Sequence, residues 1–352
     1  MVVLVDLAHG GCPECAGASL LRESGLCVFL LCGRNHRDIS GFSKALQRSH
    51  SRVQVLDSGS IAECLYCFKQ AVENQALVLP VNTHVLYLYV TRCNCFGHGF
   101  TTRSGGVSCI PTLSSLNLFS SCKRRDPVAV VMENKRRLAL HAGFHPLPLQ
   151  SVKVNHASDV WVLGQAEPDS YDSMVTNQSG LVLTAPGADC MPILFADPVK
   201  RVIGAAHAGW KGTLMGVAMA TVNAMVTNFD CRLNDILVAV GPAVGVCCFT
   251  LPREQALDFL SIHPDCVPDP ESPKPHVDIR LASRVLLQNG GVLPEHIHDD
   301  SVKDQNWVSQ CTSCHPDDFF SHVRDGLNFG TQVGFLWVKE TAKQTAAAVG
   351  QT

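Results

Sequence analysis

The fold of this chain is restricted most by a series of short β-strand patterns separated by glycine-rich turns. Helical patterns lie between some of these strands. Strands are predicted where β-branched residues gather, at 160–163, 181–184, 191–196, 201–206, 236–240 and 332–338. Helices are predicted over 214–225 and over 280–288, the second ended by Gly290 and Gly291. Pro127 begins a predicted surface helix with the apolar residues Val128, Val131, Met132, Leu138 and Leu140. This mixture excludes an all-α chain and predicts an α/β or α+β fold.

Length and charge limit the class of protein. The 352 residues suit one large domain or two ordinary ones, and the net charge of −3 provides no basic excess for binding nucleic acid. There is no cationic signal-peptide region at the start and no apolar stretch of about 18 residues, so we expect a cytoplasmic chain without a transmembrane segment. The 17 cysteines lack disulfide-framework spacing and are therefore expected to be reduced thiols.

The chain before Phe96 has a different character and is predicted to be a smaller α/β region. It contains apolar runs over 26–31 and 77–90, where short strands are plausible. Two CxxC pairs, Cys12 with Cys15 and Cys64 with Cys67, have the composition of a zinc knuckle. The long interval between the pairs exceeds the usual ribbon spacing, so coincidence in a cysteine-rich chain is the favoured interpretation.

Three segments each present one zinc-type ligand at the end of a predicted strand or in a turn. The ligands are His156 in VNHASD, Cys190 in GADCMP and His207 in AAHAGW. Zinc accepts imidazole nitrogen and thiolate sulfur, and a site with three protein ligands keeps a fourth position for water or substrate. The spacings match no short metal motif, so from the residues alone a core position for each side chain stays open.

Signature blocks in unbroken order support a family resemblance. HGFTTRSGGVS, GADCMPILFADP, AAHAGWKGT, VGPAVGVCCF and CTSCHPDDFFSHVRDG resemble the blocks of the multicopper polyphenol oxidase, or laccase-domain, family. The likeness runs from about His98 to Lys339 and is most similar to vertebrate members. It implies a four-layer α/β/β/α fold of YfiH-like type. We therefore divide the chain into an N-terminal region at 1–95 without an assigned role, an enzyme domain at 96–340 and a flexible tail at 341–352.

The resemblance also implies an activity. Family members are zinc-dependent purine nucleoside enzymes, which cleave adenosine, inosine, guanosine and methylthioadenosine with phosphate as co-substrate and deaminate adenosine to inosine. The family's zinc ligands fall on His156, Cys190 and His207. Asn155 and Val154 stand where bacterial members of the family commonly have other residues just before the first ligand. This difference puts in doubt a supporting role of these positions toward the metal, but not the ligand itself. Copper oxidation is not expected, because only one His-x-His pair, His296 with His298, is present.

Candidate residues for phosphate and substrate carry alternatives. Arg103 and Arg324 have the planar fork that suits phosphate, and Lys211 adds a point charge, although each is equally compatible with a surface ion pair. Val323 stands where the family usually has an arginine beside Arg324. No residue is identified as a general base.

Three further residues are candidates beside the ligands. Asn117 either hydrogen-bonds the substrate or caps a strand end, and Trp210 either stacks on the base or packs in the core. Asp189 precedes a ligand and is expected to orient a ligand histidine. Cys247 and Cys248 are interpreted as core residues.

Two other functions use the same sequence. In one, Cys190 is a nucleophile activated by His207 without any metal, as in cysteine amidohydrolases. In the other, the chain is a regulatory scaffold with a vestigial pocket, and its N-terminal region binds a protein partner. Removal of metal separates the first alternative from a zinc enzyme, and the absence of turnover in metal-loaded protein would indicate the second.

Overall fold

A computed structural model describes residues 95–119, 126–299 and 311–339, and the backbone of four short strands that precede them. The expectations for the N-terminal CxxC pairs and for the tail at 341–352 lie outside the described residues. The chain divides into two compact units, Met1–Asn82 with Pro127–Glu133, and Thr83–Asp126 with Asn134–Thr352.

The first unit contains a three-stranded parallel sheet. Its order is β2–β1–β3, with β1 at Val2–Asp6, β2 at Val28–Leu31 and β3 at Gln54–Asp57. In its register Leu4 lies between Leu30 and Val55. Parallel neighbours require long crossover connections, which the intervals between these strands provide.

Two larger sheets make up the second unit. The six-stranded sheet has the order β13–β12–β10–β11–β8–β7, and the five-stranded sheet the order β4–β5–β14–β9–β6. The first contains β7 (Val160–Val162), β8 (Ser173–Thr176), β10 (Met191–Asp197), β11 (Val202–Ala208), β12 (Leu237–Val240) and β13 (Ile297–His298). The second contains β4 (Val85–Leu86), β5 (Phe96–Thr101), β6 (Leu149–Ser151), β9 (Val182–Gly187) and β14 (Gln332–Val338). All six strand patterns of the sequence are thus confirmed, with small shifts at their ends, whereas β5, β6, β8 and β13 were not among them.

Helices cover the outer faces of these two sheets. The α-helices are α4 (Val128–Ala142), α5 (Trp210–Leu214), α6 (Val217–Phe229), α7 (Arg253–Leu257), α8 (Ile279–Asn289) and α9 (His322–Asp325). Short 3-10 turns cover Pro111–Leu113, Leu233–Asp235, Asp258–Ser261, Pro264–Cys266 and Pro294–His296.

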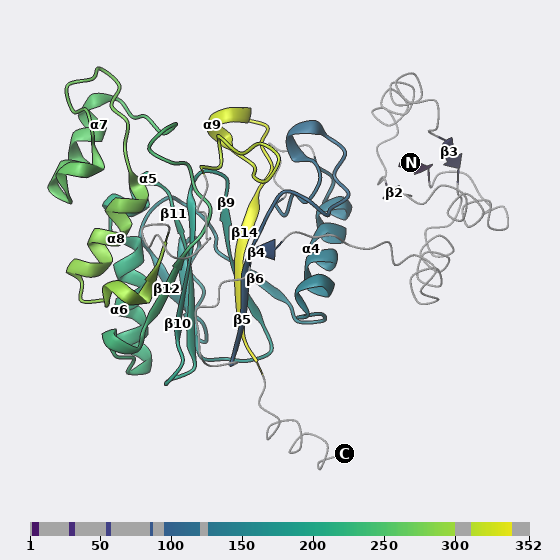
Figure 1. Cartoon of the computed structure of the whole chain (residues 1–352). Coiled ribbons are helices and arrows are strands. Elements are labelled where there is room, and N and C mark those ends of the chain that lie inside the picture. Colours follow the sequence, from purple (N-terminus) through teal and green to yellow (C-terminus); the bar gives the residue numbers. More distant parts are fainter. Residues whose placement is uncertain are drawn as a thin grey trace, which may run out of the picture. The chain divides into compact units, whose positions relative to one another are not determined.

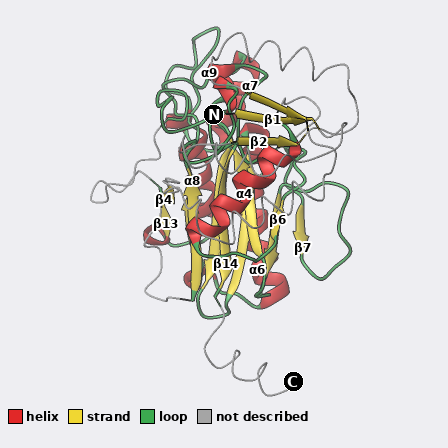
Figure 2. Cartoon of the chain, turned by 90° about the vertical axis from the view of Figure 1, so that its right-hand side faces the viewer, coloured by secondary structure: helices red, strands yellow, loops and turns green. Residues whose placement is uncertain are grey.

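Three hydrophobic cores separate the layers. One lies between the six-stranded sheet and α6 and α8, a second between the two sheets, and a third between the five-stranded sheet and the C-terminal half of α4. Figure 1 shows this order from α8 and α6 through both sheets to α4, and Figure 2 shows α4 across the face formed by β14 and β6. The predicted α+β class and the four-layer α/β/β/α arrangement are confirmed.

Local chemistry sets the ends of the helices. The helix predicted over 214–225 is two helices, because Gly216 adopts a left-handed backbone with φ of 76° and α6 begins after it. Helix α8 begins where predicted, with the Asp278 carboxylate accepting hydrogen bonds from the amides of Arg280 and Leu281. These two ends follow from single residues, so they depend little on distant packing.

The predicted apolar face of α4 is partly wrong. Val128, Met132 and Leu140 are exposed, while Leu138 is buried. Leu138 and its neighbour Ala139 pack in the core that also holds Phe335 and Trp337. The helix exists because its whole sequence favours helix, whereas the buried face is decided by the sheet it covers.

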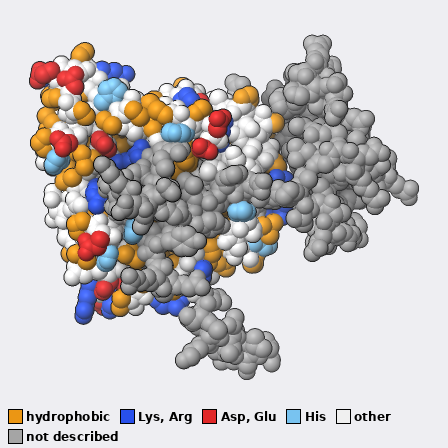
Figure 3. Space-filling model, viewed as in Figure 1, with side chains coloured by type: hydrophobic (Ala, Val, Ile, Leu, Met, Phe, Trp, Pro, Cys, Tyr) orange, Lys and Arg blue, Asp and Glu red, His pale blue; other side chains and the backbone are white. Residues whose placement is uncertain are grey.

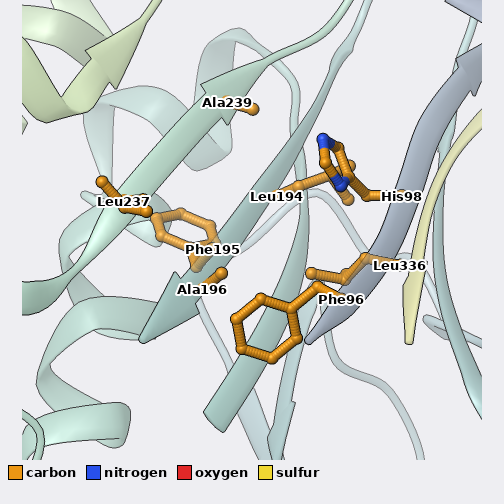
Figure 4. A pocket seen from close by; sticks show the side chains of 8 residues that line it. All are labelled: Phe96, His98, Leu194, Phe195, Ala196, Leu237, Ala239 and Leu336. Atoms are coloured by element: carbon orange, nitrogen blue, oxygen red, sulfur yellow. The ribbon is translucent and has the colours of Figure 1, made fainter. Parts of the chain in front are cut away.

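The core between the sheets leaves a small cavity of about 20 Å³. Apolar side chains of β5, β10, β12 and β14 line it together with the imidazole of His98 (Figure 4). None of the three predicted metal ligands lines it. We therefore interpret this cavity as a packing defect of the core and not as the functional site.

The surface is of mixed character. On the face shown in Figure 3, basic and acidic side chains are interspersed with hydrophobic ones. Three exposed large hydrophobic residues, Val128, Met132 and Leu140, lie on α4, and others, such as Val199 and Leu327, lie on other segments. Within the described part of the chain, none of the helices has both the length and the apolar character needed to cross a membrane.

Candidate metal centre

Three separate segments deliver the three predicted ligands to one place. His207 lies near the end of β11, Cys190 immediately precedes β10, and His156 lies in the loop between β6 and β7. In the antiparallel register of β10 with β11, His207 pairs with Pro192, which brings the end of one strand beside the start of the other. The ligand atoms of all three side chains lie within 4.8 Å of one another.

The buried carboxylate of Asp172 holds both histidines in position. Its Oδ1 lies 2.8 Å from His207 Nδ1 and accepts a hydrogen bond from the His156 amide. Its Oδ2 accepts hydrogen bonds from the amides of Asn155 and Ala157. An ionised carboxylate can only accept, so His207 carries a proton on Nδ1, and Nε2 is the nitrogen that would bind a metal once it has lost its own proton.

Charge around the ligands favours a thiolate. Burial raises the pKa of the Cys190 thiol, but His207 and hydrogen bonds from both histidines overcome this effect and lower it to about 6. Burial lowers the pKa of His207, whereas Cys190 and Asp172 raise it to about 9. Burial likewise raises the pKa of Asp172, but hydrogen bonds from His207 and from backbone amides lower it overall. Metal-free, the side chains of Cys190 and His207 thus form an ion pair around neutral pH.

The space between the ligands is kept open by Gly209. A Cβ atom there would lie 3.1 Å from Cys190 Sγ and 3.3 Å from His156 Cδ2. His207 is buried, Cys190 is half-buried and His156 is exposed, so the centre is accessible from the His156 side. Two imidazoles, one thiolate and an accessible side fit a zinc site of the catalytic type.

One ligand and one neighbour of a ligand have unusual backbone conformations. His156 has φ of 63° and Asp189 has φ of 90°, a left-handed region that non-glycine residues rarely adopt. Asp189 is held there by its side chain, which accepts hydrogen bonds of 2.6 Å from Thr312 Oγ1 and from the Val323 amide. Strained backbone of this kind is concentrated at functional sites in proteins.

The expected role of Asp189 is corrected by these contacts. The carboxylate at His207 Nδ1 is that of Asp172, and sequence reasoning missed it. Asp172 lies just before β8, whose Ser173 pairs with Ala206 of β11. Only this long-range pairing places the carboxylate beside the ligand, so no local pattern marked it.

Arg324 does not present a free fork for phosphate. Its Nε and one terminal nitrogen bind the Asp325 carboxylate at 2.9 and 2.8 Å. Its terminal nitrogens also donate to the carbonyls of Thr312, Ser313 and Phe319. All five guanidinium N–H groups therefore have protein partners, which does not favour phosphate binding, and the phosphate role of this residue stays a prediction.

Arg103 is partly committed to its own surroundings. It donates to the carbonyls of Ser114, Pro316 and Pro111, and its guanidinium lies 4.9 Å from the centre of the Phe320 ring. Burial and the nearby Arg324 lower its pKa, while the acidic side chains of Asp325 and Asp317 raise it. Three of its five N–H groups are used in these contacts, so a phosphate role for Arg103 stays a prediction.

Asn117 has a structural role in the protein. It is fully buried, and its side-chain nitrogen donates to Asp126 Oδ2 and to the Phe119 carbonyl. Its side-chain oxygen accepts from the amides of Thr331 and Phe119. The amide group is thus saturated by protein partners, which favours the structural alternative over a contact with substrate.

Lys211 and Trp210 begin α5 directly after Gly209. Lys211 is exposed, and its Nζ lies 5.3 Å from the centre of the Trp210 ring. Trp210 is half-buried and packs against the core under α6 and α8. Their predicted contacts with substrate stay predictions.

The cysteines differ from expectation in two ways. Eight described cysteines are free thiols, as predicted, but Cys95 is disulfide-bonded. Cys247 is exposed, so its interpretation as a core residue is wrong, whereas Cys248 is half-buried and packs against the core that contains α6 and α8. The structure gathers them with Cys311 and Cys314, whose CxxC spacing in CTSC was the signal that sequence reasoning passed over.

Comparison with known proteins identifies a family and several relatives of this chain. Residues 97–339 match the family described as multi-copper polyphenol oxidoreductase laccase. The chain is 61% identical over 245 residues to purine nucleoside phosphorylase LACC1 of Mus musculus, a match that covers 70% of this chain and 56% of that relative. The chain thus spans about half the length of this mammalian relative.

Prokaryotic relatives match over most of their length. Purine nucleoside phosphorylase YlmD of Geobacillus stearothermophilus is 34% identical over 69% of this chain and 90% of its own. Its crystal structure superimposes with a TM-score of 0.59 over 70% of this chain and 93% of that chain. Adenosine deaminase RL5, from an unknown prokaryotic organism, is 28% identical over 66% of this chain and 90% of its own.

Proposed function

Because the chain belongs to the multi-copper polyphenol oxidoreductase laccase family, we propose that it is a zinc-dependent purine nucleoside enzyme. The proposed reactions are phosphorolysis of adenosine, inosine, guanosine and methylthioadenosine, and hydrolytic deamination of adenosine. The names of relatives support both reactions, since one group is called purine nucleoside phosphorylase and RL5 is called adenosine deaminase. We place the protein in the cytoplasm and propose that a protein partner binds residues 1–95.

The observation that carries this proposal is the convergence of His156, Cys190 and His207 within 4.8 Å. Their nitrogen and sulfur donors would hold the zinc ion, and Asp172 would fix the proton of His207 on Nδ1. When bound there, zinc would supply Lewis-acid charge beside the nucleoside. The exposed side at His156 would admit the nucleoside, and Trp210 is proposed to stack on its base.

Phosphorolysis needs a cation to hold phosphate beside the sugar. Because Arg324 is saturated by its own partners, we propose Lys211 and the remaining N–H groups of Arg103 for this task. In the reaction a phosphate oxygen forms a bond to the anomeric carbon, the bond from that carbon to the base nitrogen breaks, and the base leaves with a proton. In deamination a water oxygen instead forms a bond to C6 of the adenine ring, the bond from C6 to the amino nitrogen breaks, and that nitrogen leaves as ammonia.

The test is incubation of the full chain, purified with reductant and analysed for zinc, with adenosine in the presence and absence of phosphate. We expect inosine without phosphate, and adenine, hypoxanthine and ribose 1-phosphate as further products only when phosphate is present. Cys190→Ala should lose one equivalent of zinc and both products while keeping its circular dichroism spectrum, with Cys109→Ser as the control at an exposed thiol. Normal zinc content and turnover in Cys190→Ala would contradict the proposal.

A metal-free cysteine enzyme is the second candidate, and the ion pair of Cys190 with His207 favours it. In metal-stripped chain, alkylation of Cys190 should become faster as pH rises through about 6, because the thiolate predominates above its pKa. Zinc should then protect this thiol. Turnover that survives the chelator and disappears on alkylation would replace the zinc enzyme with this alternative.

A further inference from the structure

A second group of thiols lies outside the candidate metal centre. Cys247, Cys248, Cys311 and Cys314 bring their four sulfur atoms within 4.8 Å of one another. Cys314 Sγ lies 3.3 Å from Cys248 Sγ and 3.6 Å from Cys247 Sγ. Cys311 is buried, Cys248 is half-buried, and the other two are exposed, so the group lies at the surface with one buried member.

The backbone holds this group in place from two segments distant in sequence. Ala243 forms a parallel bridge with Cys311, and the amide of Thr312 donates to the Ala243 carbonyl at 3.1 Å. Each segment then turns back on itself, because the Cys248 amide donates to the Gly245 carbonyl and the Cys314 amide to the Cys311 carbonyl. The thiols are therefore fixed on two tight turns and not carried on free loops.

The separation of the sulfur atoms suits a shared cation. A tetrahedral zinc ion with Zn–S bonds of about 2.3 Å places its sulfur ligands about 3.8 Å apart. The distances of 3.3 and 3.6 Å from Cys314 Sγ to Cys248 Sγ and Cys247 Sγ are close to this value, whereas a disulfide requires about 2.05 Å between its sulfur atoms. A disulfide would also use only two of the four converging thiols.

We propose that Cys247, Cys248, Cys311 and Cys314 form a second metal site, in which four thiolates hold one zinc-class ion. Binding breaks the four S–H bonds, releases four protons to solvent, forms four metal–sulfur bonds and involves no change of oxidation state. Four protein ligands leave no open position, so the site is structural and takes no substrate. This inference goes beyond the proposed function and does not depend on it.

Backbone amides around one sulfur are consistent with a thiolate there. Burial raises the pKa of the Cys311 thiol, but hydrogen bonds from the amides of Gly245, Cys314 and Ser313 and from the Cys247 side chain lower it to about 7. In the absence of metal, burial and neighbouring thiols raise the pKa of Cys247, and the Cys248 side chain raises that of Cys314. Amide hydrogen bonds to a ligand sulfur reduce its negative charge, which favours gathering four thiolates around one divalent ion.

The second site would support the first through Asp189. Thr312, between two of the cysteines in sequence, donates to Asp189 Oδ1 at 2.6 Å, and the Val244 amide donates to the Asp189 carbonyl at 3.0 Å. Asp189 directly precedes the ligand Cys190 and has the left-handed backbone described above. A metal that ties the two cysteine segments together would stabilise this conformation.

The first experiment maps zinc protection in the unaltered chain. The chain is kept reduced, stripped of metal, treated with iodoacetamide with or without added zinc, and analysed peptide by peptide by mass spectrometry. We expect zinc to slow modification of the exposed Cys247 and Cys314 at least tenfold and to leave the exposed Cys109 unchanged. Equal modification of all three with and without zinc, or a Cys248–Cys314 disulfide in the unreduced chain as isolated, would overturn the proposal.

The second experiment measures metal content by mass spectrometry in paired variants. Cys247→Ser/Cys314→Ser should contain one zinc equivalent fewer than the unaltered chain, and Cys109→Ser the same number. Differences between variants isolate this site from any metal on the N-terminal cysteines. Unchanged zinc content in a folded double variant would overturn the proposal, and a variant that does not fold leaves the decision to the protection experiment.

X-ray absorption at the zinc edge then separates the two sites. Cys190→Ala removes a ligand of the first site only. When Cys247→Ser/Cys314→Ser is added to this variant, the zinc that is then lost should be one that had four sulfur neighbours. A shell containing nitrogen for that zinc would overturn the four-thiolate assignment. Failure of the proposed function alone would appear as absent turnover with this second zinc still bound.

Discussion

At the scale of single residues, one carboxylate and one glycine shape the candidate metal centre. Asp172 connects His207 to the backbone that carries His156, so the two imidazoles share one anchor. Gly209 keeps the space between the ligands free of side-chain atoms. Neither residue offers a ligand, yet both determine whether an ion fits.

We expect Asp172→Asn to weaken zinc binding about 10- to 100-fold, as is typical for loss of a carboxylate that orients a ligand histidine. The amide cannot match the negative charge that stabilises the Nδ1 proton of His207. Competition with a chelator of known affinity measures the change. Asp169→Asn, an exposed carboxylate on the same loop, is the matched control, and equal affinities of the two variants would contradict the expectation.

Gly209→Ala should lower zinc affinity with little loss of stability, because the added Cβ lies 3.1 Å from Cys190 Sγ and crowds the thiolate and His156. Gly204→Ala provides the contrast, since its Cβ meets Thr221 and Val175 inside the core. That change should lower the melting temperature and leave zinc affinity unaltered. The same pattern of effects in both variants would show that Gly209 has no particular role at the centre.

At the scale of elements, the packing of α4 shows how a sheet selects one face of a helix. Leu138 is fully buried against the five-stranded sheet, whereas Leu140, two residues later, is 48% exposed. Both leucines have the same intrinsic preference for helix. Their difference in stability should therefore report packing alone.

Leu138→Ala is expected to lower the free energy of unfolding by about 2–5 kcal/mol, as for other buried leucines. Leu140→Ala should change it by less than about 0.5 kcal/mol. Urea denaturation followed by circular dichroism measures both. Similar losses in the two variants would mean that the helix is oriented differently in solution.

At the scale of the whole molecule, the two central sheets and their covering helices form the part that relatives share. The match to YlmD covers 90% of that protein, so the relative consists almost entirely of this part. In the present chain the compact unit that contains both sheets begins at Thr83. We therefore propose that the boundary expected near residue 96 separates an enzyme domain from an N-terminal region with another task.

A fragment beginning at Thr83 should fold and retain both proposed activities at a rate within a factor of about three of the full chain. The reason is that every described ligand, with Asp172 and the four-cysteine group, lies in this fragment. Thermal melting and the nucleoside assay with and without phosphate measure the outcome. A fragment that binds zinc but lacks turnover would assign the N-terminal region a part in catalysis.

Local sequence determined the strand patterns, the start of α8 at Asp278 and the chemical type of the three ligands, because each depends on neighbouring residues or on a signature block. Tertiary structure decided the partners of polar groups. The pairing of β8 with β11 placed Asp172 at His207, the Asp325 carboxylate and carbonyls occupied Arg324, and two distant turns gathered four cysteines. Hydrogen bonds and metal sites join atoms that are close in space, and residue order alone does not specify which distant segments meet.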